Sequence, residues 1–213
     1  DSYAKWMENK KEAHLYSESQ HAGSLGPGRS LSRMIDFSSV DHLLDVAGGT
    51  GGFAIRLCEA NPNLRVTIID FPNVVSLGHQ KVKEAGFLDR INFIEGNALD
   101  YNWPTDVGAV LMSYLYNGVP GDDIPKLVRQ SYKVMKPGGL YVVHDFMVEN
   151  DRSGPHLAAL WQLQHLAFTP TAKSITSSLV SSLLADAGFS EININELIPG
   201  MTKVVWGRKR SKD

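Results

Sequence analysis

Two aspartates and a run of glycines are the first residues in this 213-residue chain with the chemistry of a binding site. Asp45 ends an apolar stretch, residues 48–52 read Gly-Gly-Thr-Gly-Gly, and Asp70 ends the next apolar stretch. Glycines let the backbone take positive φ angles and approach a ligand closely, and free N–H groups at a helix start hold anionic or polar groups. An acidic residue roughly twenty positions later accepts hydrogen bonds from ribose hydroxyls. The pattern predicts a site for a nucleotide-like cofactor.

Two cofactor classes share this arrangement, dinucleotides and S-adenosylmethionine. A dinucleotide site favours the spacing G-x-G-x-x-G and places the pyrophosphate at the helix N-terminus, whereas the glycines here occupy positions 48, 49, 51 and 52. The carboxylate of Asp45 would repel a pyrophosphate and attract an amino or sulfonium group. The charge therefore favours S-adenosylmethionine, and an NAD-dependent oxidoreductase is the alternative from a different class of enzyme.

These residues need a scaffold that brings several strand ends to one edge, and the alternating apolar patterns predict one. Several expected strands are near-continuous apolar runs, which is typical of a parallel sheet covered by helices on both faces. Ligands bind such sheets at the carboxyl ends of the strands. The expected strands are 41–46, 65–69, 91–94, 109–114, 140–147, 192–197 and 203–207, and the expected helices are 53–59, 74–85, 124–135, 157–168 and 176–187.

The chain ahead of residue 40 is predicted to be a separate N-terminal segment (1–39), followed by one domain over 40–210. Residues 1–20 are expected to form a helix, and residues 21–29 a glycine-rich loop that either connects elements or helps enclose a cofactor. A short amphipathic helix should follow over residues 30–37. The Pro-Gly-Gly sequence at 137–139 is predicted to stop a helix ahead of a buried strand.

Four sequence motifs carry a resemblance to a known family. Residues 45–51, Asp-Val-Ala-Gly-Gly-Thr-Gly, resemble the first motif of class I S-adenosylmethionine-dependent methyltransferases, usually D-x-G-x-G-x-G, with Ala47 in place of a glycine. Residues 70–74, 93–99 and 135–140 resemble later motifs of the O-methyltransferase branch typified by plant caffeate-type and bacterial polyketide- and pigment-modifying enzymes. The resemblance implies a Rossmann-like α/β fold with a mostly parallel seven-stranded sheet and an antiparallel C-terminal hairpin.

The resemblance also assigns roles around the cofactor, S-adenosyl-L-methionine. It implies that Gly48 and Gly49 lie against the methionine part, Asp70 holds the ribose, and Phe71 flanks the adenine. Ser113 is expected near the sulfonium. The full set of implied cofactor-binding residues is Asp45, Gly48, Gly49, Asp70, Phe71, Asn97, Ala98 and Ser113, with Asn97 standing where the family more often has an aspartate.

The position of the general base raises a problem. In the resembled family the base is a histidine after the fourth strand, and Asn117 occupies that position here. Asparagine cannot act as a base near neutral pH. One interpretation places the base elsewhere, at His144 beside Asp145, or at Tyr114 or Tyr116. A second is an acceptor that needs no strong base, such as a carbon, a nitrogen or an acidic hydroxyl. A third is a protein that binds S-adenosylmethionine without methylating.

The helix expected over 157–168 is rich in apolar and aromatic residues, and the resemblance implies that it lines the acceptor pocket. A small, mostly apolar or aromatic acceptor is expected, with O-methylation as the leading reaction. The histidines of this helix lack the spacing and nearby carboxylates of a metal site, so no metal is expected. The expected substrate-binding residues are Tyr114, Trp161, His165 and Phe168.

The composition of the chain limits the classes of partner and the compartment that we expect. The formal net charge of −2 gives no support to a nucleic-acid partner. The single cysteine, Cys58, fits a reducing compartment such as the cytoplasm. The chain has no apolar run near the roughly 18 residues of a membrane span, so no membrane partner is expected. The resemblance implies a homodimer formed through an N-terminal helical domain, of which the segment 1–39 is interpreted as a remnant.

Overall fold

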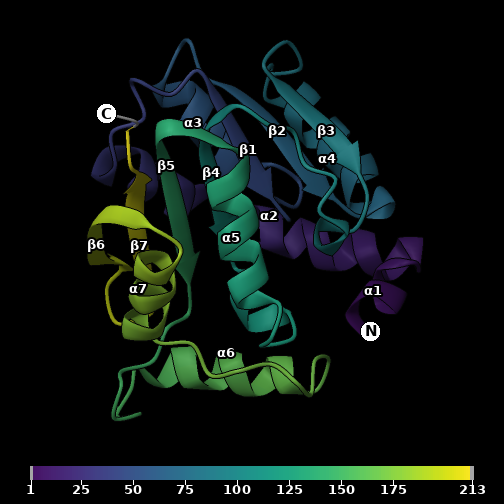
Figure 1. Cartoon of the computed structure of the whole chain (residues 1–213). Helices are drawn as coiled ribbons and strands as arrows, with labels where there is room; N and C mark the ends of the chain where they lie inside the picture. Colours follow the sequence, from purple (N-terminus) through teal and green to yellow (C-terminus); the bar gives the residue numbers. More distant parts are fainter. Residues whose placement is uncertain (1, 212–213) are drawn as a thin grey trace. The chain divides into compact units, whose positions relative to one another are not determined.

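The computed structural model describes residues 2–211, which form an N-terminal unit of residues 2–103 and a C-terminal unit of residues 104–211. Each unit combines strands and helices (Figure 1). The N-terminal unit contains α1 (Ser2–Met7), α2 (Lys10–Met34), β1 (His42–Val46), α3 (Gly52–Ala60), β2 (Arg65–Asp70), α4 (Pro72–Glu84) and β3 (Ile91–Glu95), with a short 3₁₀ helix η1 (Ala98–Asp100).

The C-terminal unit carries the remaining strands. It contains β4 (Val107–Ser113), η2 (Tyr116–Gly118), α5 (Ile124–Val134), β5 (Met135–Asp145), α6 (His156–Leu166), α7 (Ser177–Asp186), β6 (Phe189–Ile198) and β7 (Thr202–Lys209). Beyond residue 40, every expected strand and helix is present, and the ends differ by three residues or fewer except at β5.

The strands pair as the alternating pattern predicted. In the N-terminal unit, β1, β2 and β3 are parallel neighbours in the order β3-β2-β1. In the C-terminal unit, β4 and β5 are parallel, whereas β7 pairs antiparallel with both β5 and β6. The predicted fold class is therefore confirmed over the described residues: an α/β fold with seven mostly parallel strands and an antiparallel C-terminal hairpin.

The core of each unit lies on its buried strands. Four of the five residues of β1 are buried. In β4, residues 109–112 are completely buried, and Ser113 follows them at the end of the strand. Because both faces of these strands are apolar, helices must cover both faces, which fixes the carboxyl ends of the strands as the open edge. Among the described residues, no helix combines the length and apolar character needed to cross a membrane.

The largest difference from the sequence prediction is in residues 21–29, which are helical. The loop prediction was wrong because α2 continues from Lys10 to Met34. A methyl group on Gly28 would lie 3.1 Å from a backbone atom of α3, and one on Gly52 would overlap the Ser24 hydroxyl. The glycines let α2 and α3 pack closely, and this packing offsets the about 1 kcal/mol that a glycine costs a helix.

The second difference concerns residues 137–139, which were predicted to separate a helix from a strand. They belong to β5, which begins at Met135. The register between β4 and β5 shifts between Val107 and Ala109, and Gly138 has a φ of 76°. A bulge of this kind accommodates a proline, which cannot donate to the strand ladder. The stop prediction was wrong because bulges and helix ends share the same composition.

Candidate functional site

The turn between β1 and α3 is shaped by residues with positive φ. Ala47, Gly49 and Gly51 have φ values of 55°, 61° and 86°. Gly51 is the N-cap of α3, and a methyl group on it would lie 3.1 Å from Ile68. Ala47 holds a conformation that favours glycine, which explains why the resembled motif has glycine at this position. The turn therefore exposes backbone N–H groups at the start of α3.

Asp45 is a completely buried carboxylate without a hydrogen-bond partner. Its exposure is 0%, and neither carboxylate oxygen has a partner in the protein. Burial, with a smaller contribution from Asp70, raises its pKa to about 8. A side chain on Gly48 would overlap this carboxylate, so only glycine lets the turn pass it. An unpartnered buried acid is costly, and a cationic ligand group beside it would remove that cost.

Asp70 ties the end of β2 to the glycine turn. Its Oδ2 accepts a hydrogen bond from the Gly49 N–H at 2.7 Å, and its Oδ1 accepts one from the Phe71 N–H at 2.8 Å. Burial raises its pKa to about 6, and the two N–H groups partly oppose that rise. Each carboxylate oxygen has a second lone pair, so Asp70 can still accept from a ribose hydroxyl.

An aromatic cluster made of Tyr3, Trp6, Tyr16 and Phe71 packs beside Asp70. Its ring centroids are 5.0 to 6.3 Å apart. Burial raises the pKa of Tyr3 well above its usual value, and the charge of Asp70 contributes. Sequence reasoning noted Trp6 as an irregular apolar residue and assigned no role to Tyr3. The first residues of the described chain thus enclose the expected adenosyl region of the N-terminal unit.

Asn97 and Ala98 form a turn at η1. The Asn97 Oδ1 accepts from the Leu99 N–H at 3.0 Å, as an N-cap does. The Ala98 carbonyl accepts from the indole N–H of Trp103 at 2.9 Å. Asparagine makes the same cap as the aspartate usual in the family, which accounts for the exchange at this position.

Asn97 belongs to a group of residues that the fold brings together. The residues that meet at one edge of the N-terminal unit are Asp45, Gly48, Gly49, Asp70 and Phe71.

Sequence reasoning missed His21, whose Nδ1 lies 2.7 Å from the Thr50 hydroxyl. Nothing in the local pattern signals this bond, because 29 residues separate the two side chains.

His144, expected as a base, forms hydrogen bonds inside the protein. Its Nδ1 lies 2.7 Å from the Ser113 hydroxyl and its Nε2 lies 2.9 Å from the Thr202 hydroxyl. The side chain is completely buried, and burial lowers its pKa to about 3. Both ring nitrogens are thus engaged and the imidazole is neutral, so this geometry does not favour a general base here, and the role of His144 stays a prediction.

The hydroxyl of Tyr116 is also engaged inside the protein. It is completely buried, and its hydroxyl pairs with that of Tyr141 at 2.5 Å. Burial raises its pKa well above the usual value. The Tyr116 hydroxyl thus takes part in a hydrogen bond of the core, and a catalytic role for it stays a prediction.

Tyr114 lies at the end of β4 with a φ of 58°. Its ring centroid is 5.5 Å from that of Phe146 and 6.1 Å from that of Trp161. Burial raises its pKa, so the phenol stays protonated near neutral pH. A residue in this sparsely populated conformation is held there by its surroundings, and here those surroundings are aromatic.

Asn117 is held in one orientation by acceptors. Its Nδ2 donates to the Asp145 Oδ1 at 2.7 Å and to the Phe146 carbonyl at 3.0 Å. Because a carboxylate and a carbonyl only accept, the amide cannot be flipped. Its Oδ1 is buried and has no partner. Asn117 thus offers a fixed, neutral hydrogen-bond acceptor.

Trp161 and His165 join this aromatic region from α6. The Trp161 ring stacks on Phe146 with centroids 4.5 Å apart, and its indole N–H is buried without a partner. His165 Nδ1 lies 3.0 Å from the Trp161 carbonyl, and burial lowers its pKa. Of the four expected substrate residues, Tyr114, Trp161 and His165 are neighbours, whereas Phe168 lies beyond the end of α6.

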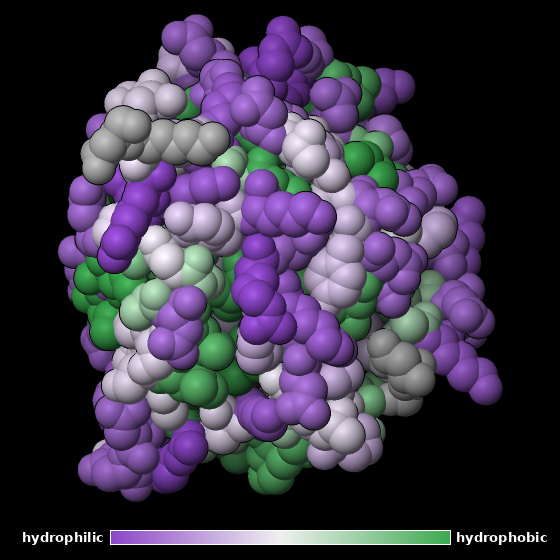
Figure 2. Space-filling model, viewed as in Figure 1, coloured by the Kyte–Doolittle hydropathy of each residue, from purple (hydrophilic) through white to green (hydrophobic). Residues whose placement is uncertain are grey.

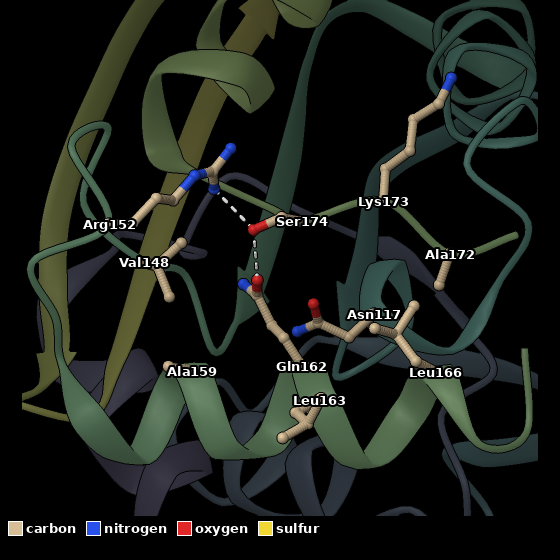
Figure 3. Close-up of a pocket in the computed structure, with 10 residues that line it drawn as sticks. All are labelled: Asn117, Val148, Arg152, Ala159, Gln162, Leu163, Leu166, Ala172, Lys173 and Ser174. Atoms are coloured by element: carbon tan, nitrogen blue, oxygen red, sulfur yellow. Dashed lines mark hydrogen bonds between the residues drawn. The ribbon is translucent and has the colours of Figure 1, made fainter. Parts of the chain in front are cut away.

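A pocket of about 290 Å³ lies in the C-terminal unit between α6 and the segment 172–174 (Figure 3). Figure 3 shows the Asn117 side chain reaching into it beside Gln162 and Leu166. Asn117 was expected as a site residue, and four more of the lining residues lie on the helix predicted over 157–168. The lining residues are Asn117, Val148, Arg152, Ala159, Gln162, Leu163, Leu166, Ala172, Lys173 and Ser174. Over residues 2–211, no cluster of three or more His, Cys, Asp or Glu side chains could hold a metal ion.

Comparison with known proteins gives consistent matches. The model of the O-methyltransferase domain family matches residues 2–190. A 3-hydroxy-5-methyl-1-naphthoate 3-O-methyltransferase of Streptomyces sahachiroi is 30% identical over 85% of this chain and 52% of its own length. Aclacinomycin 10-hydroxylase RdmB of Streptomyces purpurascens is 31% identical over 62% of this chain and 36% of its own length.

The fold match extends over nearly the whole chain. Human N-acetylserotonin methyltransferase, solved in complex with S-adenosylmethionine, superimposes with a TM-score of 0.87 at 23% identity, covering 99% of this chain and 59% of its own. The chain spans about half the length of most of the curated relatives it matches.

Proposed function

The chain belongs to the O-methyltransferase domain family, and from that premise we propose that it transfers a methyl group from S-adenosylmethionine to an oxygen of a small aromatic acceptor. The observation that carries the cofactor assignment is Asp45, a buried carboxylate with two unpartnered oxygens beside the glycine turn. An ammonium group of the cofactor would give it a charged partner. A pyrophosphate at the same place would be repelled.

The remaining contacts of the N-terminal unit fit the rest of this cofactor. The N–H groups of the turn suit its carboxylate, and the free lone pairs of Asp70 suit its ribose hydroxyls. Phe71 offers an aromatic face for the adenine. When bound, S-adenosylmethionine supplies a methyl group already activated on a sulfonium. The protein's main task is then to align the acceptor with that group.

On the acceptor side, we propose that no side chain acts as a strong base. His144 is neutral and engaged through both nitrogens, Tyr114 remains a protonated phenol, and Asn117 does not titrate. The acceptor must therefore bring an acidic hydroxyl, such as a phenol conjugated with an electron-withdrawing group. The printed substrate of the S. sahachiroi relative, a hydroxynaphthoate, likewise carries a hydroxyl on an aromatic ring.

Binding of S-adenosylhomocysteine, measured by titration calorimetry, tests the cofactor assignment. We expect Asp70→Ala to weaken binding at least tenfold, because it removes both the ribose partner and the acceptor that holds the turn. Asp151→Ala, at an exposed position outside the N-terminal unit, should leave binding unchanged. Wild-type protein that binds neither adenosyl compound would contradict the proposal.

A second candidate is a protein that binds S-adenosylmethionine without methylating. Two observations favour it: the neutral Asn117 at the expected base position, and a relative named as a hydroxylase. Mass spectrometry of acidic phenols incubated with the protein and cofactor separates the two. A mass gain of one methyl group supports methyl transfer, and its absence with every acidic phenol supports the second candidate.

The domain division, the oligomeric state and the location of the protein are also proposals. The division into a segment 1–39 and a domain 40–210, a homodimer and a cytoplasmic location follow from the family and from the single cysteine. Cys58 is buried, and burial raises the pKa of its thiol to about 11, which makes it unreactive. Light scattering after size exclusion, at several protein concentrations, tests the dimer.

A further inference from the structure

The pocket in the C-terminal unit has positive charge at its rim and apolar side chains along α6. Arg152 and Lys173 are exposed, and the described lining residues include no carboxylate. Leu163 and Leu166 are 64% and 43% exposed. Figure 2 shows hydrophobic surface at the lower edge of the molecule, where Figure 1 places α6. The pocket therefore suits a ligand with an apolar body and an anionic group.

The two cations differ in whether an acid already neutralises them. Lys173 pairs with Asp122, its Nζ lying 2.7 Å from the Asp122 carboxylate. Arg152 donates from one guanidinium nitrogen to the Ser174 hydroxyl, and no described carboxylate pairs with it. A guanidinium has five N–H donors arranged to bind a carboxylate through two parallel bonds. Arg152 keeps donors for such a ligand.

The acids close to Arg152 in the sequence are engaged elsewhere. Asp151 accepts a hydrogen bond from the Ser153 N–H at 3.0 Å. Glu149 forms an ion pair with Lys203. Neither acid forms an ion pair with Arg152 in the described structure.

A chain of hydrogen bonds connects Arg152 to the floor of the pocket. The Ser174 hydroxyl donates to Gln162 Oε1 (Figure 3). The Gln162 amide donates to the carbonyls of Phe146 and Ile175. The Phe146 carbonyl also accepts from Asn117. Both amide groups are thereby fixed, and the Asn117 Oδ1, buried and unpartnered, marks the other end of the site.

We propose that this pocket binds the methyl acceptor and that the acceptor is an aromatic hydroxycarboxylate. Its carboxylate pairs with Arg152, its rings lie against Leu163 and Val148, and its hydroxyl donates a hydrogen bond to the Asn117 Oδ1. This inference rests on the proposed function and names the chemistry of its substrate. It assigns to Arg152 the choice between charged and neutral acceptors.

Calorimetric titration with 1-naphthoate and with naphthalene-1-carboxamide tests the inference, in the presence of S-adenosylhomocysteine. The two probes have the same ring system and differ in charge. We expect the wild-type protein to bind the carboxylate about fivefold more tightly, because the exposed Arg152 guanidinium can pair with it through two parallel bonds. Arg152→Gln should abolish this preference and leave carboxamide binding within twofold.

Lys173→Gln is the matched control, because it removes a rim cation that already has an acid partner. It should keep the preference for the carboxylate. Equal binding of both probes by the wild-type protein, no binding of either, or a preference that survives Arg152→Gln would each overturn the inference. Thermal unfolding of both variants confirms that they fold.

The failure of this inference differs from failure of the proposed function. Methylation of a hydroxynaphthoate with no dependence on Arg152 would overturn the anion site and leave methyl transfer intact. An Arg152-dependent preference for 1-naphthoate without any methyl transfer would support the anion site and overturn the proposed function.

Discussion

The two units treat their buried polar groups in opposite ways. In the N-terminal unit, the buried acid Asp45 is left without any partner beside a turn shaped by glycine. In the C-terminal unit, the titratable His144 and Tyr116 are engaged within the protein, and the groups left unpartnered are the neutral Asn117 Oδ1 and Trp161 N–H. The first unit is thus built to recognise charge in its interior, and the second to orient a ligand through neutral hydrogen bonds and ring contacts.

Gly48→Ala should have the largest effect, because the added methyl overlaps the Asp45 carboxylate. We expect binding of S-adenosylhomocysteine to fall by more than a hundredfold in calorimetry, and unfolding free energy to fall by about 1–3 kcal/mol, as overpacked sites do. Gly23→Ala is the control, since nothing lies within 4 Å of its added methyl. A Gly48→Ala protein that binds normally would show that the turn does not contact the cofactor.

Asn117→Leu probes the other unit. It removes the donor to the Asp145 carboxylate, and we expect the free energy of unfolding in urea to fall by about 1–3 kcal/mol because the acid loses a hydrogen bond. S-adenosylhomocysteine binding should stay within threefold of wild type. Gln164→Leu, an exposed substitution on α6, should change stability by less than about 0.5 kcal/mol. Strong loss of cofactor binding in Asn117→Leu would erase the contrast between the units.

The pH dependence of stability should have opposite signs for Asp45 and His144. The pKa of Asp45 is raised to about 8 by burial, so the folded protein holds a proton that the unfolded chain releases above about pH 3.9. This group therefore lowers the free energy of unfolding as pH rises from 6.5 to 8, by up to about 1.4 kcal/mol per unit. Asp45→Asn should flatten that slope in urea titrations. An unchanged slope would refute the assignment.

His144 acts in the opposite direction. Burial lowers its pKa to about 3, so below about pH 6.5 the unfolded chain takes up a proton that the folded protein does not. This group lowers stability as pH falls from 6.5 to 5. His144→Gln should reduce that acid-side loss, measured in the same urea titrations, and leave the slope above pH 7 unaltered.

Ala47→Gly should have the smallest effect. Relief of the positive φ gains roughly 1 kcal/mol, and the greater freedom of glycine in the unfolded chain offsets about 0.4–1 kcal/mol of it. We expect the thermal midpoint to be unchanged or slightly raised and cofactor binding to be kept. A large loss of stability would mean that the alanine methyl makes contacts of its own.

Whether a part of each unit could be predicted from the sequence depends on how far apart in the chain its contacting residues lie. The aspartates and glycines of the cofactor turn form a local pattern, so Asp45, Gly48 and Asp70 could be chosen from the sequence. Tyr3 could not, because its neighbour Asp70 is distant in the chain. The α/β alternation was equally local, and its strands were predicted within a few residues.

The catalytic side depends on long-range pairs. The partners of His144, Ser113 and Thr202, are 31 and 58 residues away, and the donor–acceptor pair of Asn117 and Asp145 is separated by 28. A histidine at a strand end looks available until those hydroxyls are placed. Sequence alone therefore located the problem at Asn117 and could not exclude the histidine.

α2 is a continuous helix that contacts the turn between β1 and α3. Its 25 residues form one helix, with a rise of about 1.5 Å per residue. Its middle is joined to the cofactor turn by the His21–Thr50 bond and by the close approach of Ser24 to Gly52. These contacts, all on the N-terminal side of Pro27, hold the turn against α2.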